Sequence, residues 1–386
     1  MKDKLQPLRS KIDELDSKLV HLLNERTKLV LKIGKVKQTS GSEIYAPDRE
    51  DAVLRRIVEK GEGPLPADSL RAIYREVMSA SLALEKALVI AYLGPEASYS
   101  HLAVIKKFGS SLKYEPLPSI TDVFAEVAKD RADYGVVPIE NSTEGAVTHT
   151  YDMFLDSDLK ICAQIVLPIR HNLMAAIPRD QIKKIYSIPQ VLSQCRQWLH
   201  LNMPHVELIE TSSSTRAAQI AKTEPNAGAL ASSLAAEMYG LTILEANVQD
   251  SSENVTRFLV IGRKYPGRTG SDKTSIMFSV QDHVGALHDS IASFKKFKIN
   301  MTKIESRPSK KKAWEYYFFV DILGHCEDAL VKKALAELAK HTMFVKILGS
   351  YPNVNGWTGR RGGGERVRAG ACYRGVRNRG VLRPGQ

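Results

Sequence analysis

An apolar heptad near the amino end restricts the fold of this chain more than any other feature. Its members alternate at spacings of three and four residues, which keeps them on one face of an α-helix. The pattern predicts one long helix over residues 5–37, with Pro7 in the first turn, where the missing N–H of proline costs no hydrogen bond. The apolar positions are Leu5, Leu8, Ile12, Leu15, Leu19, Leu22, Leu29, Ile33 and Val36.

One position of this heptad holds a cation, because Arg26 stands where the next apolar residue belongs. A guanidinium on an apolar helical face is costly unless a negative group meets it. Two explanations remain open here. Arg26 pairs with a carboxylate of the protein, such as Glu25 or one from another helix, or it binds an anionic ligand.

Two further cations flank the heptad face, Arg9 and Lys37. Arg26 and Lys37 are eleven residues apart, roughly 16 Å along a helix at nearly the same azimuth, so both side chains can reach one small ligand. Arg9 lies about 25 Å from Arg26 on the same arithmetic, too far to share that ligand. Arg9 is therefore expected to serve the site of a partner subunit, which predicts a homodimer or a higher homo-oligomer.

Two more helices are predicted before residue 88. Pro47 opens one whose inner face carries Arg49 with Glu50 beside it, and the other runs from about residue 67 to 87. Ser81 and Glu85 are neighbours on the latter, since residues four apart share a helical face. Residues 1–88 are thus predicted to form an all-helical domain with charges turned inward.

From Val89 the pattern changes to short apolar runs that alternate with helical segments, as far as residue 265. Repeated strand–helix units predict α/β layers that bind ligands at the carboxyl ends of strands. Several polar or small residues fall at or near such ends: Gly94, Ser98, Asn141, Ser187, Gln194, Ser213, Thr215 and Thr256.

The stretch from Asp133 to Phe154 combines an apolar run with clustered polar residues. Its run Tyr134–Ile139 contains Pro138 and predicts a buried strand that pairs little beyond its end. Residues 140–144 then lead into a helix-compatible segment. A strand that delivers hydroxyls and amides to a helix start can form an anion pocket, and an ordinary helix cap is the alternative.

Residues 273–352 read as strand, helix, strand, strand, helix, strand, which is the ferredoxin-like order of an α+β domain. A linker rich in turn-forming residues, 264–273, precedes them. The tail 353–386 holds eight arginines, nine glycines and one glutamate, too little apolar material for a core, and is predicted to be disordered. Either it binds nucleic acid or it is a read-through end without selected function, and its biased composition favours the second.

Composition excludes several classes of protein. The chain has 386 residues, 43% hydrophobic and 25% charged, which suits two or three soluble domains. No apolar run approaches 18 residues and the first ten residues lack a signal core, so we expect a cytoplasmic protein that binds no membrane. The tail, with eight Arg and one Glu, carries +7 of the net charge of +12, and the remaining +5 is spread over residues 1–352 without a basic stripe for nucleic acid. The cysteines are far apart and predict reduced thiols without a metal site: Cys162, Cys195, Cys326 and Cys372.

Four segments in order resemble prephenate dehydratase, across about residues 91–265. They are YLGPEASYSH from Tyr92, DYGVVPIENSTEGAVTHTYDMF from Asp133, YSIPQVLSQC from Tyr186 and ENVTRF from Glu253. With the flanking segments, the chain to about residue 352 resembles the bifunctional bacterial P-protein family, in which chorismate mutase is joined to prephenate dehydratase.

For the helical segment the resemblance implies a chorismate mutase domain. Catalysis then falls to Lys37 and Glu85 at the ether oxygen, while Arg9 and Arg26 clamp the two carboxylates. Arg49 and Glu50 are implied at the hydroxyl end, and Ser81 is a further substrate-binding residue. The sequence departs from the family at Ala46, where some members have Asp, and at Glu85, where many have Gln.

For residues 89–265 the resemblance implies two subdomains around a cleft, like a periplasmic binding protein, with the second subdomain at about 168–247. Thr256 would contact the leaving hydroxyl, and Arg257 would fix the substrate or its loop. The other implied substrate-binding residues are Ser98, Asn141, Ser142, Thr143, Ser187, Gln194 and Ser213.

The motifs GALH from Gly285 and ESRP from Glu305 resemble the amino-acid-binding ACT domain of this family. The implied effector is L-phenylalanine. The implied effector residues are Gly285, Ala286, Leu287, Asn300, Glu305, Ser306, Arg307 and Pro308.

The resemblance therefore implies an enzyme that converts chorismate to prephenate and prephenate to phenylpyruvate, needs no cofactor, and is inhibited by phenylalanine. A sensor with a binding-protein-like cleft and no chemistry is the alternative. Thr256 and the inward-facing charges Arg26, Lys37 and Glu85 argue against a sensor, which needs no group at a breaking bond.

Overall fold

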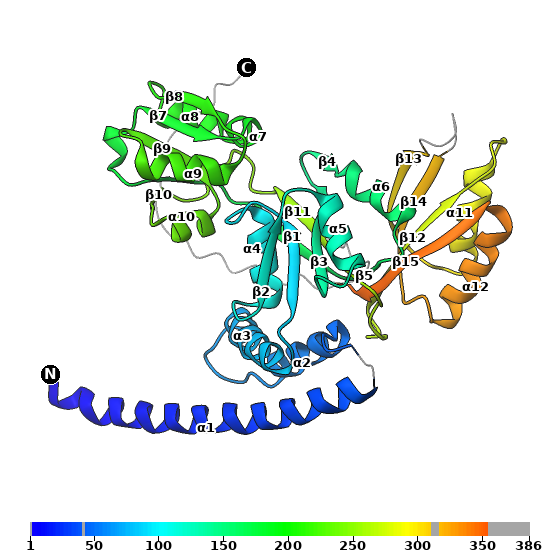
Figure 1. Cartoon of the computed structure of the whole chain (residues 1–386), viewed down its shortest axis with the longest axis horizontal. Coiled ribbons are helices and arrows are strands. Elements are labelled where there is room, and N and C mark those ends of the chain that lie inside the picture. Colours follow the sequence, from blue (N-terminus) through cyan, green and yellow to red (C-terminus); the bar gives the residue numbers. More distant parts are fainter. Residues whose placement is uncertain (1, 41–42, 310–315, 354–386) are drawn as a thin grey trace, which may run out of the picture. The chain divides into compact units, whose positions relative to one another are not determined.

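The computed structural model describes residues 2–40, 43–309 and 316–353, so the predicted disordered tail from residue 354 onward, with Cys372, lies outside the described residues. Three helices come first: α1 (Lys2–Ser40), α2 (Pro47–Glu59) and α3 (Ala67–Glu85) (Figure 1). The long helix is confirmed, but it begins earlier than predicted, so Pro7 lies inside it and not in its first turn. The nine apolar heptad positions are between 48% and 66% exposed, because no described residue covers this face of α1.

A mixed sheet follows, in the order β2-β1-β3-β11-β5 with the short β4 paired to β3. Strand β1 is parallel to β2 and β3, whereas β11 is antiparallel to both β3 and β5. Its strands are β1 (Val89–Leu93), β2 (Lys113–Leu117), β3 (Tyr134–Asn141), β4 (Gly145–Ala146), β5 (Lys160–Pro168) and β11 (Val255–Gly262). Its helices are α4 (Tyr99–Phe108), α5 (Ile120–Ala128) and α6 (Thr148–Asp156).

Strand β3 corrects two predictions for the stretch from Asp133. The strand continues through Pro138 to Asn141, because a register shift in the partner strand β11, between Arg257 and Phe258, accommodates the irregularity. The chain then turns back into β4, and α6 starts only at Thr148 without a side-chain cap. The polar residues 141–144 therefore form a tight turn between two strands, and neither the helix-start anion pocket nor the helix cap is present there.

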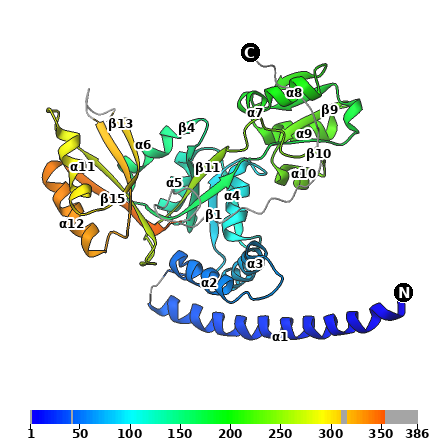
Figure 2. The same ribbon diagram turned by 180° about the vertical axis from the view of Figure 1, so that it is seen from behind.

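A second sheet has the order β10-β6-β9-β7-β8. The chain leaves the first sheet at Pro168, enters the second at Asn172, and returns to the first at Val255. Figure 2 shows α9 lying against this sheet, where its alanines pack on those of β9. The elements are β6 (Asn172–Ala175), η1 (Arg179–Gln181), β7 (Lys184–Ser187), α7 (Pro189–Gln194), α8 (Arg196–Asn202), β8 (Glu207–Glu210), α9 (Ser214–Thr223), β9 (Ala227–Ala231), α10 (Ser233–Tyr239) and β10 (Thr242–Glu245).

The last described segment forms a four-stranded antiparallel sheet in the order β13-β14-β12-β15. Helices α11 and α12 pack together on one face of it, over a core that includes Phe278, Phe294 and Val320 (Figure 1). The element order is the predicted one: β12 (Asp272–Ser279), α11 (Ala286–Lys296), β13 (Met301–Pro308), β14 (Tyr316–Leu323), α12 (Ala329–Leu338), η2 (Ala339–His341) and β15 (Phe344–Pro352).

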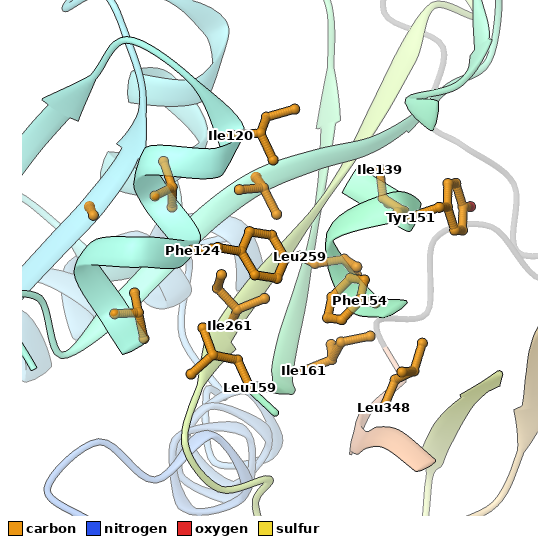
Figure 3. Packing of buried hydrophobic residues seen from close by; sticks show 14 of the residues in the cluster. Ile120, Phe124, Ile139, Tyr151, Phe154, Leu159, Ile161, Leu259, Ile261 and Leu348 are labelled. Carbon is orange, nitrogen blue, oxygen red and sulfur yellow. The ribbon is translucent and has the colours of Figure 1, made fainter. Parts of the chain in front are cut away.

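The first and third sheets share one buried cluster, which Figure 3 shows from close by. Phe124 of α5 and Phe154 of α6 meet edge to face at 5.2 Å between ring centroids. Ile161 of β5 and Leu348 of β15 belong to the same cluster. Because this core is continuous, the four-stranded sheet is packed against the dehydratase-like strands and is not merely tethered to them.

No helix within the described ranges is long and apolar enough to cross a membrane. Cys162, Cys195 and Cys326 are buried and unpaired with one another.

Candidate active sites

A cavity of about 330 Å³ is walled chiefly by α1, α2 and α3. Its size falls within the range of about 300–1,000 Å³ that small-molecule sites occupy. Six of the seven residues predicted for the mutase site line it: Arg26, Lys37, Arg49, Glu50, Ser81 and Glu85. The seventh, Arg9, is exposed on α1 and does not line the cavity, as the distance along the helix predicts.

Within the described part of the chain, Arg26 forms a hydrogen bond with a hydroxyl and no ion pair with a carboxylate. Its Nη1 donates to Ser81 Oγ at 2.7 Å, and Ser81 in turn donates to the Val77 carbonyl at 2.7 Å. Glu25, the carboxylate weighed as a partner of Arg26, pairs with Lys28 at 2.8 Å. The guanidinium thus reaches the cavity wall from α1 and is held there by the buried Ser81 of α3.

Lys37 and Glu85 face each other across the cavity wall. The Lys37 ammonium donates to the Ile44 carbonyl at 2.7 Å and lies 3.8 Å from Glu85 Oε2. The Glu85 side chain is 7% exposed, and its burial raises the pKa of the carboxyl above its usual value, although Lys37 and Arg26 act to lower it. Burial therefore outweighs the two cations, which is the balance that sequence alone left undecided.

A glycine allows α1 to approach Glu85 this closely. A Cβ at Gly34 would lie 3.1 Å from Glu85 Cγ, tighter than ordinary van der Waals contact. A side chain at position 34 would therefore require Glu85 or α1 to shift by a few tenths of an ångström.

The cavity also has a wall from outside the three helices. Lys107 and Phe108, at the carboxyl end of α4, line it together with Tyr45. Lys107 Nζ donates to Glu50 Oε2 at 2.8 Å. Neither α4 residue was predicted for this site, because in the sequence they belong to the strand–helix pattern that begins at Val89.

A second cluster of polar groups gathers around Thr256 on β11, which is buried. The Asn141 amide donates from Nδ2 to Thr256 Oγ1 at 2.7 Å and to Asn254 Oδ1 at 2.9 Å. Its Oδ1 accepts from the backbone N–H groups of Thr143 at 2.9 Å and Glu144 at 3.0 Å. Since backbone N–H groups can only donate, the orientation of the Asn141 amide is fixed.

Gln194 connects the second sheet region to this cluster. From the end of α7, its Nε2 donates to Thr143 Oγ1 at 3.3 Å and to Glu144 Oε1 at 3.1 Å. Its Oε1 accepts from Asn254 Nδ2 at 2.9 Å and lies 2.8 Å from Nε2 of His171, whose pKa is lowered by burial. Asn254 lies in the quoted ENVTRF motif but was not selected, and no pattern in the sequence pointed to His171.

The remaining predicted dehydratase residues have local roles in the structure. Ser142 connects the end of β3 to the segment before β11, as its Oγ donates to the Glu253 carbonyl at 2.9 Å. Ser98 and Ser213 cap α4 and α9, accepting from His101 N and Arg216 N. Ser187 is fully buried and donates to the Leu230 carbonyl at 2.7 Å, so its hydroxyl does not face the Thr256 cluster.

Of the two roles expected for Arg257, fixing the substrate or fixing its loop, the contacts of Arg257 favour the second. Neighbouring residues of a strand point to opposite faces, so Arg257 leaves the face that Thr256 occupies. Its Nη2 contacts Asp321 Oδ2 of β14 at 2.6 Å, and Nη1 lies 3.6 Å from Glu140 Oε2. Arg257 therefore connects the dehydratase-like sheet to the four-stranded sheet, and it does not lie where it would bind substrate beside Thr256.

This connection is a buried network of charges. Asp321 also accepts from Ser275 Oγ at 2.5 Å, and Lys303 Nζ contacts Glu140 Oε1 at 2.7 Å. Burial acts to raise the pKa of Asp321, but Arg257 and Lys273 outweigh it and leave that pKa below its usual value. Asp321 is therefore ionised in the folded protein across the neutral range.

Most of the predicted effector residues gather near one end of the four-stranded sheet, but Asn300 lies at the opposite end, where its carbonyl accepts from Leu323 N. Gly285 has φ +84°, a left-handed conformation that favours glycine, and it begins α11. Register brings Arg307 of β13 and Ser279 of β12 both opposite Tyr317, so the two motifs emerge on the same side. Arg307 contacts Asp152 at 3.4 Å. Ala286 alone among the predicted residues lines a nearby cavity of about 250 Å³. The others are Leu287 in α11, Asn300 before β13, and Glu305, Ser306 and Pro308 in β13.

Comparison with known proteins identifies both segments. The chorismate mutase type II family matches residues 8–86 and the prephenate dehydratase family matches residues 90–266. The bifunctional chorismate mutase/prephenate dehydratase of Aquifex aeolicus (strain VF5) is 49% identical over 355 residues, 91% of this chain and 98% of that protein. The protein of the same description from Stutzerimonas stutzeri is 42% identical over 357 residues, with the same coverage.

A solved structure agrees with these matches. The prephenate dehydratase from Arthrobacter aurescens, in complex with L-Phe, has a TM-score of 0.64 at 31% identity, covering 69% of this chain and 90% of that chain. The matched segments, their order and the two clusters of functional residues lead to one conclusion: the chain belongs to the family of bifunctional chorismate mutase/prephenate dehydratases.

Proposed function

We propose that this chain rearranges chorismate to prephenate in the cavity around Glu85, and then converts prephenate to phenylpyruvate at the Thr256 cluster. The observation that carries the proposal is the cavity itself, in which Arg26 and Lys37 surround a buried Glu85 with a raised pKa. Such a site suits a small dianion whose ether oxygen gains charge.

The first reaction breaks the ether C–O bond and forms a C–C bond in one step, with no atom lost and no proton transferred. The protein therefore has to hold the folded conformer of chorismate and stabilise the negative charge on the ether oxygen. Lys37 donates to that oxygen from one side. Glu85 donates from the other in its acid form, which its burial favours.

Arg26 binds one substrate carboxylate by giving up its contact with Ser81 or sharing it. Arg9 of a second subunit binds the other. The exposed apolar face of α1 supports this assignment, because a row of nine half-exposed aliphatic side chains is unfavourable in water. We therefore propose a homodimer, or a higher homo-oligomer, in which α1 helices pack together and exchange Arg9.

In the second reaction the ring carboxylate leaves as CO2, its electron pair aromatises the ring, and the ring hydroxyl takes up one proton and leaves as water. Asn141 donates to Thr256 Oγ1, so the Thr256 hydroxyl hydrogen points elsewhere and is available to the leaving hydroxyl. Thr256 is a weak acid, so it acts as a donor within a relay that recovers the proton from solvent.

Residues 273–352 are proposed to be an ACT domain that binds L-phenylalanine and lowers the dehydratase activity. The βαββαβ order supports a binding role, as does the position of the GALH and ESRP segments at the same end of the sheet. The Arthrobacter aurescens relative was crystallised with L-Phe. The Arg257–Asp321 contact supplies a physical route, since a shift of β14 moves the residue next to Thr256.

The domain limits that follow are 1–88 for the mutase, 89–265 for the dehydratase with a second subdomain at about 168–247, and 273–352 for regulation, in a cytoplasmic protein. The test is a chorismate assay in which prephenate and phenylpyruvate are both monitored, with and without phenylalanine. Sequential appearance of the two products is expected. Binding of phenylalanine without any turnover would instead support the sensor.

A further inference from the structure

Glu50 is the cavity residue whose partner lies outside the mutase helices. Its Oε2 accepts from Lys107 Nζ at 2.8 Å, and Lys107 belongs to α4, which packs on the dehydratase sheet. The two side chains are 14% and 21% exposed, so water screens the pair only in part. Both line the cavity.

The position of Lys107 is fixed by a dense set of hydrogen bonds between α3 and the end of α4. Arg75 Nη1 donates to the Lys106 carbonyl at 2.7 Å, which satisfies a carbonyl in the last turn of α4. Glu76 Oε2 accepts from Ser110 N at 3.0 Å and from Ser110 Oγ at 2.8 Å. Ser111 N donates to the buried Ser79 Oγ at 3.1 Å.

The backbone between these bonds comes unusually close to α3. Gly109 ends α4 with φ +78°, and a Cβ there would lie 2.5 Å from the Ser79 Cβ, which no real side chain tolerates. Phe108 and Tyr45 are both buried and their rings lie 5.0 Å apart, while Lys107 Nζ lies 5.8 Å from the Tyr45 ring centroid. The end of α4 is therefore a rigid platform that presents Lys107 to Glu50.

We propose that Lys107 is a positioning residue of the mutase site, which holds the Glu50 carboxylate in the orientation that receives the hydroxyl end of chorismate. The dehydratase segment thereby completes the mutase site. A solvent-exposed lysine contributes little through an ion pair, because the pair costs side-chain entropy. Here the packing of the helix end already restricts Lys107 and so lowers that cost. This inference rests on the proposed mutase function and on the role proposed for Glu50.

The experiment uses the full chain with Lys107→Met, which keeps the length of the aliphatic stem and removes the charge. Lys106→Met is the matched control, because Lys106 is exposed and its ammonium contacts only the Val166 carbonyl, at 3.5 Å, among the hydrogen bonds of the described residues. We expect mutase kcat/KM to fall about tenfold or more in Lys107→Met, the loss of one hydrogen bond to a charged group, and to stay unchanged in Lys106→Met. Dehydratase kcat/KM should stay within about twofold of wild type in both.

Two further variants separate positioning from general damage. Lys107→Arg should restore most of the mutase activity, since it returns a cation. Glu50→Gln should lose activity by itself, and adding Lys107→Met to it should cost little more, because Lys107 acts through the carboxylate. A full additional loss in the Glu50→Gln background, undiminished mutase activity in Lys107→Met, or an equal loss of dehydratase activity would each overturn the inference. A wild-type protein without mutase activity would refute the proposed function instead.

Discussion

The pH dependence of the mutase depends on Glu85, and Glu85→Gln is the change that isolates it. A carboxyl group beside an oxygen that gains negative charge assists only when protonated. At the usual pKa of 4.5, about one Glu85 in a thousand would carry its proton at pH 7.5. Burial raises the pKa of Glu85, and each unit of that rise increases the active fraction about tenfold at this pH.

The direction of the pH dependence follows because the protonated form of Glu85 is the active one. Mutase kcat/KM of the wild type should be level below the Glu85 pKa and fall about tenfold per pH unit above it. Glu85→Gln carries a permanent donor of nearly the same shape, so its profile should lack this limb and exceed the wild type at alkaline pH. The assay is mutase kcat/KM at closely spaced pH values for both proteins. Superimposable profiles would refute a contact between Glu85 and the reacting oxygen.

Three other perturbations test the remaining parts of the account. Mixing Arg9→Ala chains with Lys37→Ala chains should restore about a quarter of the mutase activity after statistical exchange of subunits. Half of the dimers are then hybrids, and one of the two sites in each hybrid is intact. No recovery after demonstrated exchange would contradict shared sites. Replacing Gly285 by Trp should abolish inhibition by phenylalanine while uninhibited turnover persists. Tryptophan disfavours the φ of +84° that Gly285 adopts and fills the space that a ligand needs. Full sensitivity to phenylalanine would locate the effector site elsewhere. Asp321→Asn should weaken that inhibition and lower the free energy of unfolding by about 3–5 kcal/mol, because the buried Arg257 loses the negative charge of its closest partner. Unchanged inhibition in a variant of wild-type stability to denaturant would exclude this pair from the coupling route.

The sequence predicted the parts of the fold that depend on local periodicity. The apolar heptad identified α1 to within three residues at each end, and the alternation of strands and helices identified the ferredoxin-like order of the last segment. Helical azimuth and rise also predicted that Arg26 and Lys37 share a cavity, and the distance along the helix predicted that Arg9 does not line it. These properties follow from the geometry of one element at a time, which a sequence pattern encodes directly.

Contacts between distant elements could not be predicted in this way. The polar residues 141–144 suit a helix start as well as a tight turn, and only the pairing of β4 with β3 decides between them. Strand alternation places Arg257 and Thr256 on opposite faces of β11, which the sequence could have shown. The partner of Arg257 could not be predicted, because Asp321 lies 64 residues further along the chain and no local pattern points to it. Lys107 was missed for the same reason, since its partner Glu50 is 57 residues away on another predicted domain.

The central claim is that one chain carries two separate catalytic sites, and a reciprocal pair of variants tests it most directly. Each protein is assayed with chorismate for the mutase and with prephenate for the dehydratase. Lys37→Ala should lower mutase kcat by about 100- to 1,000-fold, the usual effect of losing a donor to a developing charge, and leave prephenate turnover intact. Thr256→Ala should do the reverse. If either variant, shown to be folded, lost both activities together, the two-site account would be contradicted.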